Sequence, residues 1–195
     1  MAKVVLATGN PGKVAEMQAV LQEFGLEVIP QSEFDIAEAI EDGLSFVENA
    51  IIKARHACQL TRLPAIADDS GLEVDALNGA PGIYSSRYAD GLGDQANNLK
   101  LLEVLAGNAN RTARFQCVIV FMQHQHDPTP FICQGTWEGE IATQAAGDGG
   151  FGYDPIFYLP NHGCNLAELE PTIKKQLSHR AKALVQLENQ LKNSI

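Results

Sequence analysis

The chain opens with a short apolar run that leads into a helical repeat of apolar positions. Residues 4–7 are continuously apolar, as in a strand buried on both faces, and the sequence TGNPGK follows at 8–13. Asn10 is suited to cap a helix that begins at Pro11, and apolar residues then recur at helical spacing until Gly25 stops the helix. The pattern therefore predicts a strand, a loop and a helix in direct succession.

The next part of the chain predicts a second succession of strand, helix and strand. Residues 26–30 (LEVIP) indicate a short strand, and the acidic, weakly patterned stretch 31–43 indicates a loop. Ser45, with Glu48 three residues later, has the spacing of a capping box and predicts a helix of about four turns. Residues 64–71 (PAIADDSG) predict a buried strand that delivers two carboxylates and ends in a turn.

The remaining pattern predicts irregular structure, a helix and a hairpin. Residues 79–93 are rich in Gly and Pro, and Asp94 is expected to cap a helix that Gly107 ends. Residues 113–122 and 131–141 are rich in β-branched and aromatic residues and are joined by a polar turn, which predicts an antiparallel hairpin. Helices and strands alternate without an internal repeat, so the fold class is mixed α/β.

Composition fits a globular protein without an extended basic surface. The chain has 195 residues, of which 45% are hydrophobic and 19% charged, so residues 1–195 are expected to form a single domain. Its 14 Lys and Arg against 24 Asp and Glu give a net charge of −10. Binding to DNA, RNA or acidic lipid needs clustered cations, so no nucleic-acid or membrane partner is expected, and an anionic ligand must be small and locally held.

The cysteines and the N-terminal sequence favour a reducing, cytoplasmic setting. Cys58, Cys117, Cys133 and Cys164 are widely spaced and form no CxxC pair. The apolar run near the N-terminus is too short for a signal-peptide core or a membrane span, and no later run reaches about 18 apolar residues. We therefore expect a cytoplasmic protein with reduced cysteines.

The TGNPGK loop has the features of a phosphate site. Between a strand and a helix, its backbone N–H groups and the helix dipole would face an anion, and Lys13 would add a positive charge. It is not a Walker A loop, which has a longer spacing and a Ser or Thr after the lysine, where this chain has Val14. A plain capped turn explains the segment equally well.

Two adjacent carboxylates, Asp68 and Asp69, indicate a bound cation. They lie at the expected end of an apolar strand, and a divalent metal is the simplest relief of their mutual repulsion. Because successive strand residues point to opposite faces, only one of them need reach the ligand. Glu41 is the nearest acidic candidate for a second metal ligand. An acidic turn at DDSG and a solvated loop around Glu41 are the simpler alternatives.

Residues 151–154 (FGYD) combine aromatic rings with a carboxylate inside a glycine-rich run. Such rings can stack on a flat ligand, and Asp154 can bind its hydrogen-bonding edge. Packing of Phe151 and Tyr153 in the core is the alternative, although four glycines within 147–152 exceed what packing alone requires.

A small basic cluster precedes and opens the C-terminal helix. Ser178 is the expected cap of this helix, so His179 and Arg180 would project from its first turn. The helix dipole disfavours positive charge there, and Lys174 and Lys175 lie just upstream in an otherwise acidic chain. The cluster favours an anionic or carbonyl-bearing partner near the helix start.

Taken together, four segments resemble the Ham1 or inosine-triphosphatase family: TGNPGK (8–13), ADDSGLEVDALNGAPGIYSSRYA (67–89), GGFGYDPIF (149–157) and LSHRAKAL (177–184). The resemblance runs from residue 3 to residue 192. It implies a homodimeric, magnesium-dependent enzyme that converts inosine, deoxyinosine or xanthosine triphosphate to the monophosphate and pyrophosphate. It also implies an α/β fold of two lobes around a long twisted mixed β-sheet flanked by helices, with the active site in the cleft between the lobes.

The resemblance assigns roles to residues by position. Asp69 would accept a proton and bind Mg²⁺ with Glu41, Asp68 would act beside it, and Ser70 would contact the nucleotide. The triphosphate would be held by Thr8, Gly9, Asn10, Pro11, Gly12, Lys13 and Lys174, and the base by Phe151, Gly152, Tyr153, Asp154, His179 and Arg180. Donors from His179 and Arg180 would suit the 6-carbonyl of hypoxanthine or xanthine and would meet another donor in adenine.

Two other functions fit parts of the pattern. A pyrophosphatase for modified pyrimidine nucleotides on a similar scaffold would differ in base preference. A nucleotide sensor would bind a purine triphosphate without hydrolysing it, and the intact Asp68 and Asp69 argue against this function. Turnover of inosine triphosphate, with its products identified, separates the three.

Overall fold

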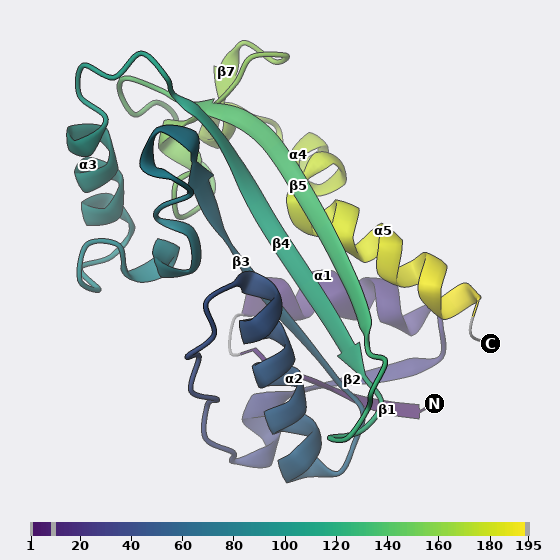
Figure 1. The fold of residues 1–195 in the computed structure, drawn as a ribbon. Helices are drawn as coiled ribbons and strands as arrows, with labels where there is room; N and C mark the ends of the chain where they lie inside the picture. The colour runs from purple at the N-terminus through teal and green to yellow at the C-terminus, as the bar shows by residue number, and fades with distance from the viewer. Residues whose placement is uncertain (1, 9–10, 194–195) are drawn as a thin grey trace. The chain divides into compact units, whose positions relative to one another are not determined.

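The chain folds into alternating strands and helices in a computed structural model that describes residues 2–8 and 11–193 (Figure 1). The strands are β1 (Ala2–Leu6), β2 (Leu26–Pro30), β3 (Ala65–Val74), β4 (Thr112–Met122), β5 (Phe131–Ile141), β6 (Phe157–Leu159) and β7 (Cys164–Asn165). The helices are α1 (Pro11–Gln22), α2 (Phe46–Thr61), α3 (Asp94–Val104), α4 (Pro171–Leu177) and α5 (His179–Lys192). Short 3₁₀ helices occupy Gln31–Phe34, Asp75–Leu77, Gly82–Arg87, Asp154–Ile156 and Leu166–Glu168.

The described strands form one mixed sheet in the order β2-β1-β3-β4-β5-β6-β7. β1 runs parallel to both β2 and β3, whereas β6 is antiparallel to β5 and β7. Hydrogen bonds pair the side chain of Gln116 with Thr136 and that of Arg114 with Glu138. Residue numbers fall along β4 while those of their partners rise along β5, so β4 and β5 are antiparallel. The expected α/β class, mixed sheet and hairpin are confirmed.

Two compact units make up the chain. The first unit contains Met1–Asp69, Cys117–Gly135 and Lys182–Ile195, and the second contains Ser70–Gln116 and Thr136–Ala181. Strands β3, β4 and β5 each contribute residues to both units. Each unit has its own cluster of buried apolar side chains.

In the first unit, the strand order indicates that α1 and α2 cover opposite faces of the sheet. The chain passes from β1 to β2 through α1, and then back across β1 to β3 through α2. Crossovers between parallel strands are right-handed, so the change of direction puts the two helices on opposite faces. The packing agrees, because Met17 and Leu21 of α1 cluster with Val4 and Leu6, which share one face of β1.

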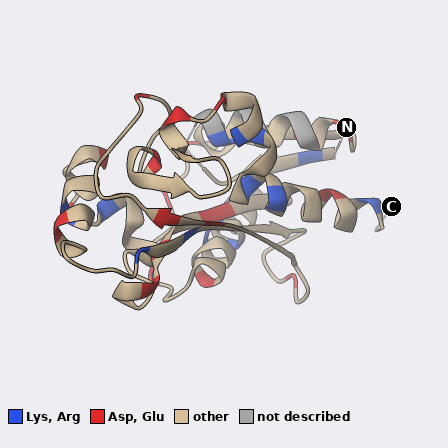
Figure 2. Cartoon of the chain, turned by 90° about the horizontal axis from the view of Figure 1, so that it is seen from above, with Lys and Arg blue, Asp and Glu red and all other residues tan. Residues whose placement is uncertain are grey.

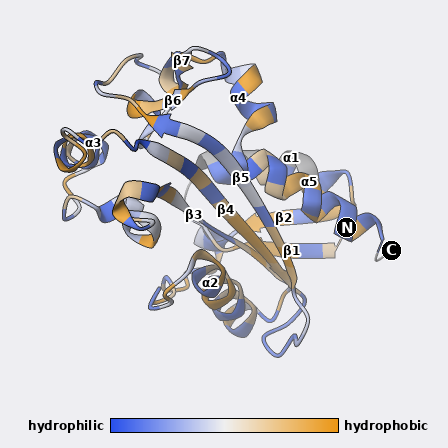
Figure 3. Cartoon of the chain, turned by 45° about the horizontal axis from the view of Figure 1, so that its top comes forward, coloured by the Kyte–Doolittle hydropathy of each residue, from blue (hydrophilic) through white to orange (hydrophobic). Residues whose placement is uncertain are grey.

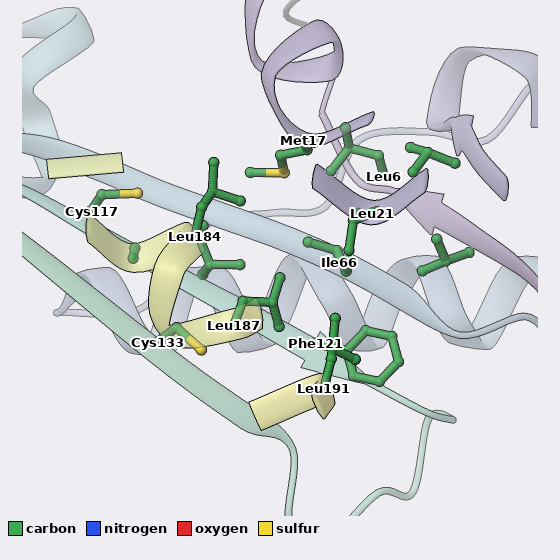
Figure 4. Close-up of a cluster of buried hydrophobic side chains, with 14 residues drawn as sticks. Leu6, Met17, Leu21, Ile66, Cys117, Phe121, Cys133, Leu184, Leu187 and Leu191 are labelled. Carbon is green, nitrogen blue, oxygen red and sulfur yellow. The ribbon is translucent and has the colours of Figure 1, made fainter. Parts of the chain in front are cut away.

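Helix α5 joins α1 on the same face and completes the core of the first unit (Figure 4). Leu184, Leu187 and Leu191 of α5 pack in the cluster that also holds Ile66 of β3 and Phe121 of β4. Their spacing of three and four residues puts them on one side of a helix. The predicted apolar face of the C-terminal helix is confirmed.

Strand β4 carries a continuous apolar run, residues 117–122, at its C-terminal end (Figure 3). Cys117, Ile119 and Phe121 alternate along the strand and belong to the cluster with α1 and α5. The residues between them are also buried and therefore face the opposite side of the sheet. A strand covered on both faces is expected to be apolar throughout.

Helix α2 begins as predicted and lies close to the sheet. The Ser45 hydroxyl oxygen accepts a hydrogen bond from the Glu48 N–H at 3.3 Å, and the Glu48 carboxylate accepts one from the Leu44 N–H at 2.9 Å. Ala50 and Ala54 are fully buried. Their small side chains allow the helix backbone to approach the strands closely.

The second unit forms its core from the other ends of the long strands. Leu72 of β3, Phe115 of β4 and Ile141 of β5 cluster with Leu101 of α3 and with Phe157. The rings of Phe115 and Phe157 lie 4.6 Å apart at 49°. This geometry is typical of a tilted aromatic contact.

The turn expected at DDSG is wrong, because β3 continues through these residues to Val74. Leu72 and Val74 are fully buried, and the Leu72 N–H donates to the Ser85 hydroxyl oxygen at 2.9 Å. Burial of the apolar residues after the acidic pair holds the strand extended. This tertiary packing outweighs the turn propensity of Asp, Ser and Gly.

The cap expected at Asp94 is also wrong. Gly93 is the cap residue of α3, and the Asp94 carboxylate accepts a hydrogen bond from the Gly152 N–H at 2.7 Å instead. The Asp94 carboxylate, which the local pattern assigned to the start of the helix, therefore binds the Gly152 N–H, 58 residues away in the chain.

The elements that the sequence pattern missed are short. They are α4, β6 and β7, together with the five short 3₁₀ helices, one of which lies at Gln31–Phe34 in the segment expected to be a loop. Elements of this length carry too few residues to show a periodic pattern. Within residues 2–8 and 11–193, no helix is both long and apolar enough to cross a membrane.

Alkylation is expected to distinguish Cys164 from the other cysteines. Cys58, Cys117 and Cys133 are buried, and burial raises the pKa of Cys58 and of Cys133 to about 11. Fewer than about one in a thousand of those two thiols is ionised at neutral pH, and the thiolate is the nucleophile. Native protein treated with iodoacetamide should carry the label on Cys164 alone, as read by peptide mass spectrometry. Equal labelling of all four before unfolding would contradict this burial.

Candidate active site

The carboxyl end of β1 lies where the strand order of the sheet changes direction. The chain leaves β1 toward β2 on one side and later returns to β3 on the other. Ligands of open parallel α/β sheets bind beyond the carboxyl ends of the strands at such a point. The register pairs Leu6 with Ile66, so Thr8 is level with Asp68 two residues further on. Thr8, the first residue of the predicted phosphate loop, and the acidic pair therefore belong to one end of the first unit.

Asp68 and Asp69 point to opposite faces of β3, and each meets a lysine. The Asp68 carboxylate is fully buried and lies 2.8 Å from Nζ of Lys13 on α1. The Asp69 carboxylate lies 2.9 Å from Nζ of Lys53 on α2. The alternation of side chains along a strand thus divides the two charges between two helices on opposite faces.

Lys53 also lies 3.0 Å from the carboxylate of Glu41, so it bridges Glu41 and Asp69. Burial lowers the pKa of Lys53, but the attraction of Asp69 and Glu41 outweighs it and leaves the pKa raised. Burial is the largest influence on the pKa of Asp69. Together with the nearby charges of Glu41 and Asp68, burial raises this pKa even though Lys53 lowers it. A carboxylate with a raised pKa is a stronger base than one in open solvent.

Sequence analysis missed Lys53, although the pattern holds a signal for it. Positions 46, 50, 53 and 57 follow helical spacing, and the other three are buried apolar residues. A lysine on the buried face of an amphipathic helix needs a charged partner nearby. That signal points to a carboxylate on the strand that the helix covers.

In the second unit, the carboxylate of Asp154 holds the FGYD segment together. It is buried, and it accepts hydrogen bonds from the Phe151 N–H at 2.9 Å and from Nζ of Lys174 on α4. Nζ of Lys174 also lies 5.1 Å from the centre of the Phe151 ring, within the range of a cation–π contact. The Phe151 side chain is 64% exposed. Its ring is available for stacking on a ligand, and core packing does not explain it.

Tyr153 faces the interior of the same unit. Its ring is buried, and its hydroxyl donates to the Ser85 carbonyl at 2.8 Å. Burial raises the pKa of Tyr153, so the phenol keeps its proton at neutral pH. Packing, the alternative proposed from the sequence, therefore explains Tyr153.

The glycines before this segment are required by close approach of other groups. Gly150 has φ +79°, and a Cβ there would overlap the carboxylate of Asp154. At Gly149 a Cβ would lie 2.6 Å from the carbonyl oxygen of Ala167. Neither position has room for a side chain, so the glycine run lets the backbone pass close to the Asp154–Lys174 pair.

Helix α5 opens with His179 and Arg180, whose side chains are largely enclosed. The Ser178 hydroxyl oxygen accepts a hydrogen bond from the Ala181 N–H at 3.1 Å, which confirms the predicted cap. The His179 ring stacks on Phe115, with centres 5.0 Å apart at 14°. Arg180 is 6% exposed. The second unit therefore holds the His179 ring through Phe115, and Arg180 is shielded from solvent.

The other predicted site residues lie beside these groups or outside the described residues. Thr8 is half-buried two residues after the end of β1, and Ser70 is half-buried next to Asp69 on β3. Pro11 and Gly12 are the first residues of α1, as the sequence predicts, whereas Gly9 and the expected cap Asn10 lie outside the described residues. The predicted residues thus fall into two groups: Thr8, Lys13, Glu41, Asp68 and Asp69 in the first unit, and Ser70, Phe151, Gly152, Tyr153, Asp154, Lys174, His179 and Arg180 in the second.

The carboxylates that contact Lys53 have the chemistry of a magnesium site. Among the described residues, no three His, Cys, Asp or Glu side chains gather into a ready-made metal cluster. Glu41 and Asp69 nevertheless meet at one ammonium group, about 3 Å from each. Magnesium in nucleotide enzymes is usually held by one or two carboxylates, with water and phosphate completing its shell. The donor set fits that ion.

Basic residues are spread over several elements and interspersed with acidic ones (Figure 2). Lys13, Lys53 and Lys174 each lie within contact of a carboxylate. Dispersed cations of this kind form no extended basic surface. They suit a small polyanion that a few of them can contact locally.

Comparison with known proteins gives the family. The model of the Ham1 family matches residues 4–190. A protein of Vibrio parahaemolyticus named dITP/XTP pyrophosphatase is 62% identical over 98% of this chain and 97% of its own length. A solved structure of a HAM1 protein from Coxiella burnetii has a TM-score of 0.96 and 52% identity, covering 99% of this chain and 100% of that one. A Ham1 protein structure from Staphylococcus aureus has a TM-score of 0.92 and 41% identity, with the same coverage. The chain therefore belongs to the Ham1 family.

Proposed function

We propose that this protein hydrolyses non-standard purine nucleoside triphosphates (ITP, dITP and XTP) to the monophosphate and pyrophosphate, and so removes them from the nucleotide pool. The observation that carries the proposal is the 62% identity, over 98% of the chain, to a protein named dITP/XTP pyrophosphatase. In this proposal residues 1–195 act as one enzyme domain in a cytoplasmic homodimer. The lysine–carboxylate pairs of the first unit and the exposed aromatic ring of the second supply groups that the reaction needs.

The triphosphate is assigned to the loop after β1 and to two lysines. Thr8 and the backbone N–H groups at the start of α1 would face an anion placed at the carboxyl end of β1. Lys13 adds a full charge, and its pairing with the buried Asp68 fixes where that charge lies. The loop residues assigned to this role are Thr8, Gly9, Asn10, Pro11, Gly12 and Lys13, and Lys174 is assigned to it from the second unit.

Glu41 and Asp69 are the residues that would hold Mg²⁺. When bound, the ion would neutralise charge that develops on the phosphate oxygens. Lys53 contacts both carboxylates and keeps them turned toward one position. Removing that lysine would leave two carboxylates of like charge facing each other.

Asp69 is assigned to orient the attacking water and to accept its proton. Water attacks the α-phosphorus, the bond from that phosphorus to the oxygen bridging to the β-phosphate breaks, and pyrophosphate leaves. The raised pKa of Asp69, caused by burial, makes its carboxylate the better base for this step. Asp68 is assigned a role through Lys13, and Ser70 is assigned a contact with the nucleotide. Neither Asp68 nor Ser70 needs to reach the water.

The base is assigned to the second unit, where Phe151 provides an exposed ring for stacking. Gly152, Tyr153 and Asp154 complete the segment. His179 and Arg180 supply donors that would pair with a 6-carbonyl, whereas adenine presents an amino donor at that position. A buried unpaired donor costs about 1–3 kcal/mol, so each mismatch gives roughly 5- to 150-fold discrimination.

Replacing Arg180 with Ala is expected to lower the preference for inosine triphosphate over ATP by at least about fivefold, because a donor to the 6-carbonyl is lost. The measurement is the ratio of the two kcat/KM values on one preparation, which does not depend on the fraction of folded enzyme. Arg114→Ala is the matched control, since that arginine of the same unit is bound by Asp75 and Glu138. An unchanged ratio in Arg180→Ala would contradict the assignment.

Turnover of ITP, XTP, ATP and GTP with and without Mg²⁺ tests the proposal. The expected products are the monophosphate and pyrophosphate, formed from the first two substrates and only with the metal. Preference for a modified pyrimidine triphosphate would favour the related pyrimidine enzyme, and tight binding without products would favour a sensor. Release of orthophosphate would contradict attack on the α-phosphorus.

A further inference from the structure

We propose that Asp94 and Asn98 of α3 are positioning residues that hold Gly152, and through it the base-binding segment 151–154, in its working conformation. The inference rests on the proposed function, because it concerns the site assigned there to the purine base. It adds a specificity role for a helix that the sequence analysis left without one.

The two side chains bind both backbone polar groups of one residue. The Asp94 carboxylate accepts a hydrogen bond from the Gly152 N–H at 2.7 Å, and the Asn98 amide donates one to the Gly152 carbonyl at 3.0 Å. Asp94 and Asn98 are four residues apart, so they lie on one side of α3. A single helix face therefore fixes the position of Gly152.

Fixing Gly152 also fixes the residues on either side of it. Gly152 has φ +61°, a left-handed conformation that turns the chain sharply between Phe151 and Tyr153. The Tyr153 hydroxyl is bound to Ser85, and the Phe151 N–H is bound to Asp154. With Gly152 also held, the 64% exposed Phe151 residue belongs to a segment in which residues 151, 152 and 153 are each held by a hydrogen bond. A stacking platform needs this preorganisation, since small displacements weaken the contacts with a bound base.

The choice of Asn98 is not explained by stability alone. The residue is 9% exposed, and its Oδ1 atom is buried with no hydrogen-bond partner among the described residues. A buried acceptor left unpaired is destabilising, and an apolar side chain at this position would avoid that cost. The amide is accounted for by the bond that it donates to Gly152.

Neighbouring residues of α3 provide matched controls. Asn97 is also buried, but it accepts from the Ala89 N–H at 2.7 Å and donates to the Ser86 carbonyl, so these hydrogen bonds go to residues outside the 151–154 segment. Gln95 is exposed beside Asp94. Asn97→Ala should reproduce the loss of buried hydrogen bonds, and Gln95→Ala the loss of an exposed polar side chain, without releasing Gly152.

The test is steady-state hydrolysis of inosine triphosphate and ATP by Asp94→Ala, Asn98→Ala, Asp94→Asn and the two controls. Asp94→Ala and Asn98→Ala are each expected to raise KM for inosine triphosphate by about tenfold, the change that about 1.4 kcal/mol of lost binding produces, with a much smaller change in kcat. Both should also lower the preference for inosine triphosphate over ATP. Asp94→Asn should restore most of the affinity, because an amide oxygen still accepts from the Gly152 N–H. Protection of the Gly152 amide from hydrogen exchange should fall in Asp94→Ala and recover in Asp94→Asn.

The outcomes separate this inference from the proposed function. A wild-type protein that leaves inosine triphosphate intact would overturn the proposed function and, with it, the nucleotide role of the pair. Wild-type turnover together with unchanged KM and base preference in Asp94→Ala and Asn98→Ala would overturn the positioning role alone. Equal effects in Asn97→Ala would show that Asp94 and Asn98 are ordinary structural residues, and would also overturn the positioning role.

Discussion

Substituting Asn for Asp69 is expected to abolish turnover while the protein remains folded and still binds nucleotide. Asn has nearly the same shape but cannot accept the proton of the attacking water, and it brings no negative charge to Mg²⁺. Loss of a general base alone lowers kcat by roughly 100- to 10,000-fold, and loss of a metal ligand adds to this. Lys53 keeps Glu41 as a partner, so no buried ammonium is left without a carboxylate. Steady-state kinetics, thermal melting and nucleotide titration measure the three effects.

The matched control for Asp69→Asn is Glu73→Gln on the same strand. The Glu73 carboxylate accepts a hydrogen bond from the side chain of Gln116 in the second unit, and the proposed reaction assigns it no role. We expect Glu73→Gln to keep wild-type turnover. Near-wild-type turnover in Asp69→Asn would refute the base assignment, whereas a collapse of its melting temperature would show that Asp69 serves the fold.

Asp154→Ala should both destabilise the protein and weaken nucleotide binding. The carboxylate is buried and is the partner of Nζ of Lys174 and of the Phe151 N–H. Removing one partner of a buried ion pair costs about 3 kcal/mol or more, because the other is left uncompensated. For a chain of this size that loss corresponds to a fall in melting temperature of roughly 6–12 °C. Release of the Phe151 backbone should also raise KM for inosine triphosphate.

Asp148→Ala is the control for this change, because Asp148 is an exposed carboxylate in the same glycine-rich run. It should melt with the wild type and keep the wild-type KM. If Asp154→Ala also matched the wild type in both measurements, the Asp154–Lys174 pair would have neither the structural nor the binding role assigned to it.

Much of the fold follows from local sequence patterns. Three features lie where the sequence predicts them: the helix that begins at Pro11, the strand at Leu26–Pro30 and the capping box at Ser45. The expected cap Asn10 lies outside the described residues. In each case a nearby residue or a periodic apolar face decides the structure. The errors at DDSG and Asp94 have the opposite cause, since burial of Leu72 and a bond to a distant residue override the local preference.

The sequence indicates candidate groups for the site, whereas the contacts that hold these groups come from the structure. Lysines, carboxylates and an aromatic ring in the four motif segments indicate which groups could act, and the structure pairs Lys13 with Asp68 and Lys174 with Asp154. The sequence pattern did not reveal that Lys53 bridges Glu41 and Asp69. The helical spacing around Lys53 indicates that this lysine needs a charged partner, but its contacts join residues far apart in the chain, so local spacing does not identify both partners.

Hydrolysis of inosine triphosphate in ¹⁸O-labelled water tests the central claim most directly. If water attacks the α-phosphorus, mass spectrometry will find the label in inosine monophosphate and none in pyrophosphate. Label in pyrophosphate would mean attack on the β-phosphorus, and labelled orthophosphate would mean attack on the γ-phosphorus. Either result would contradict the proposed reaction.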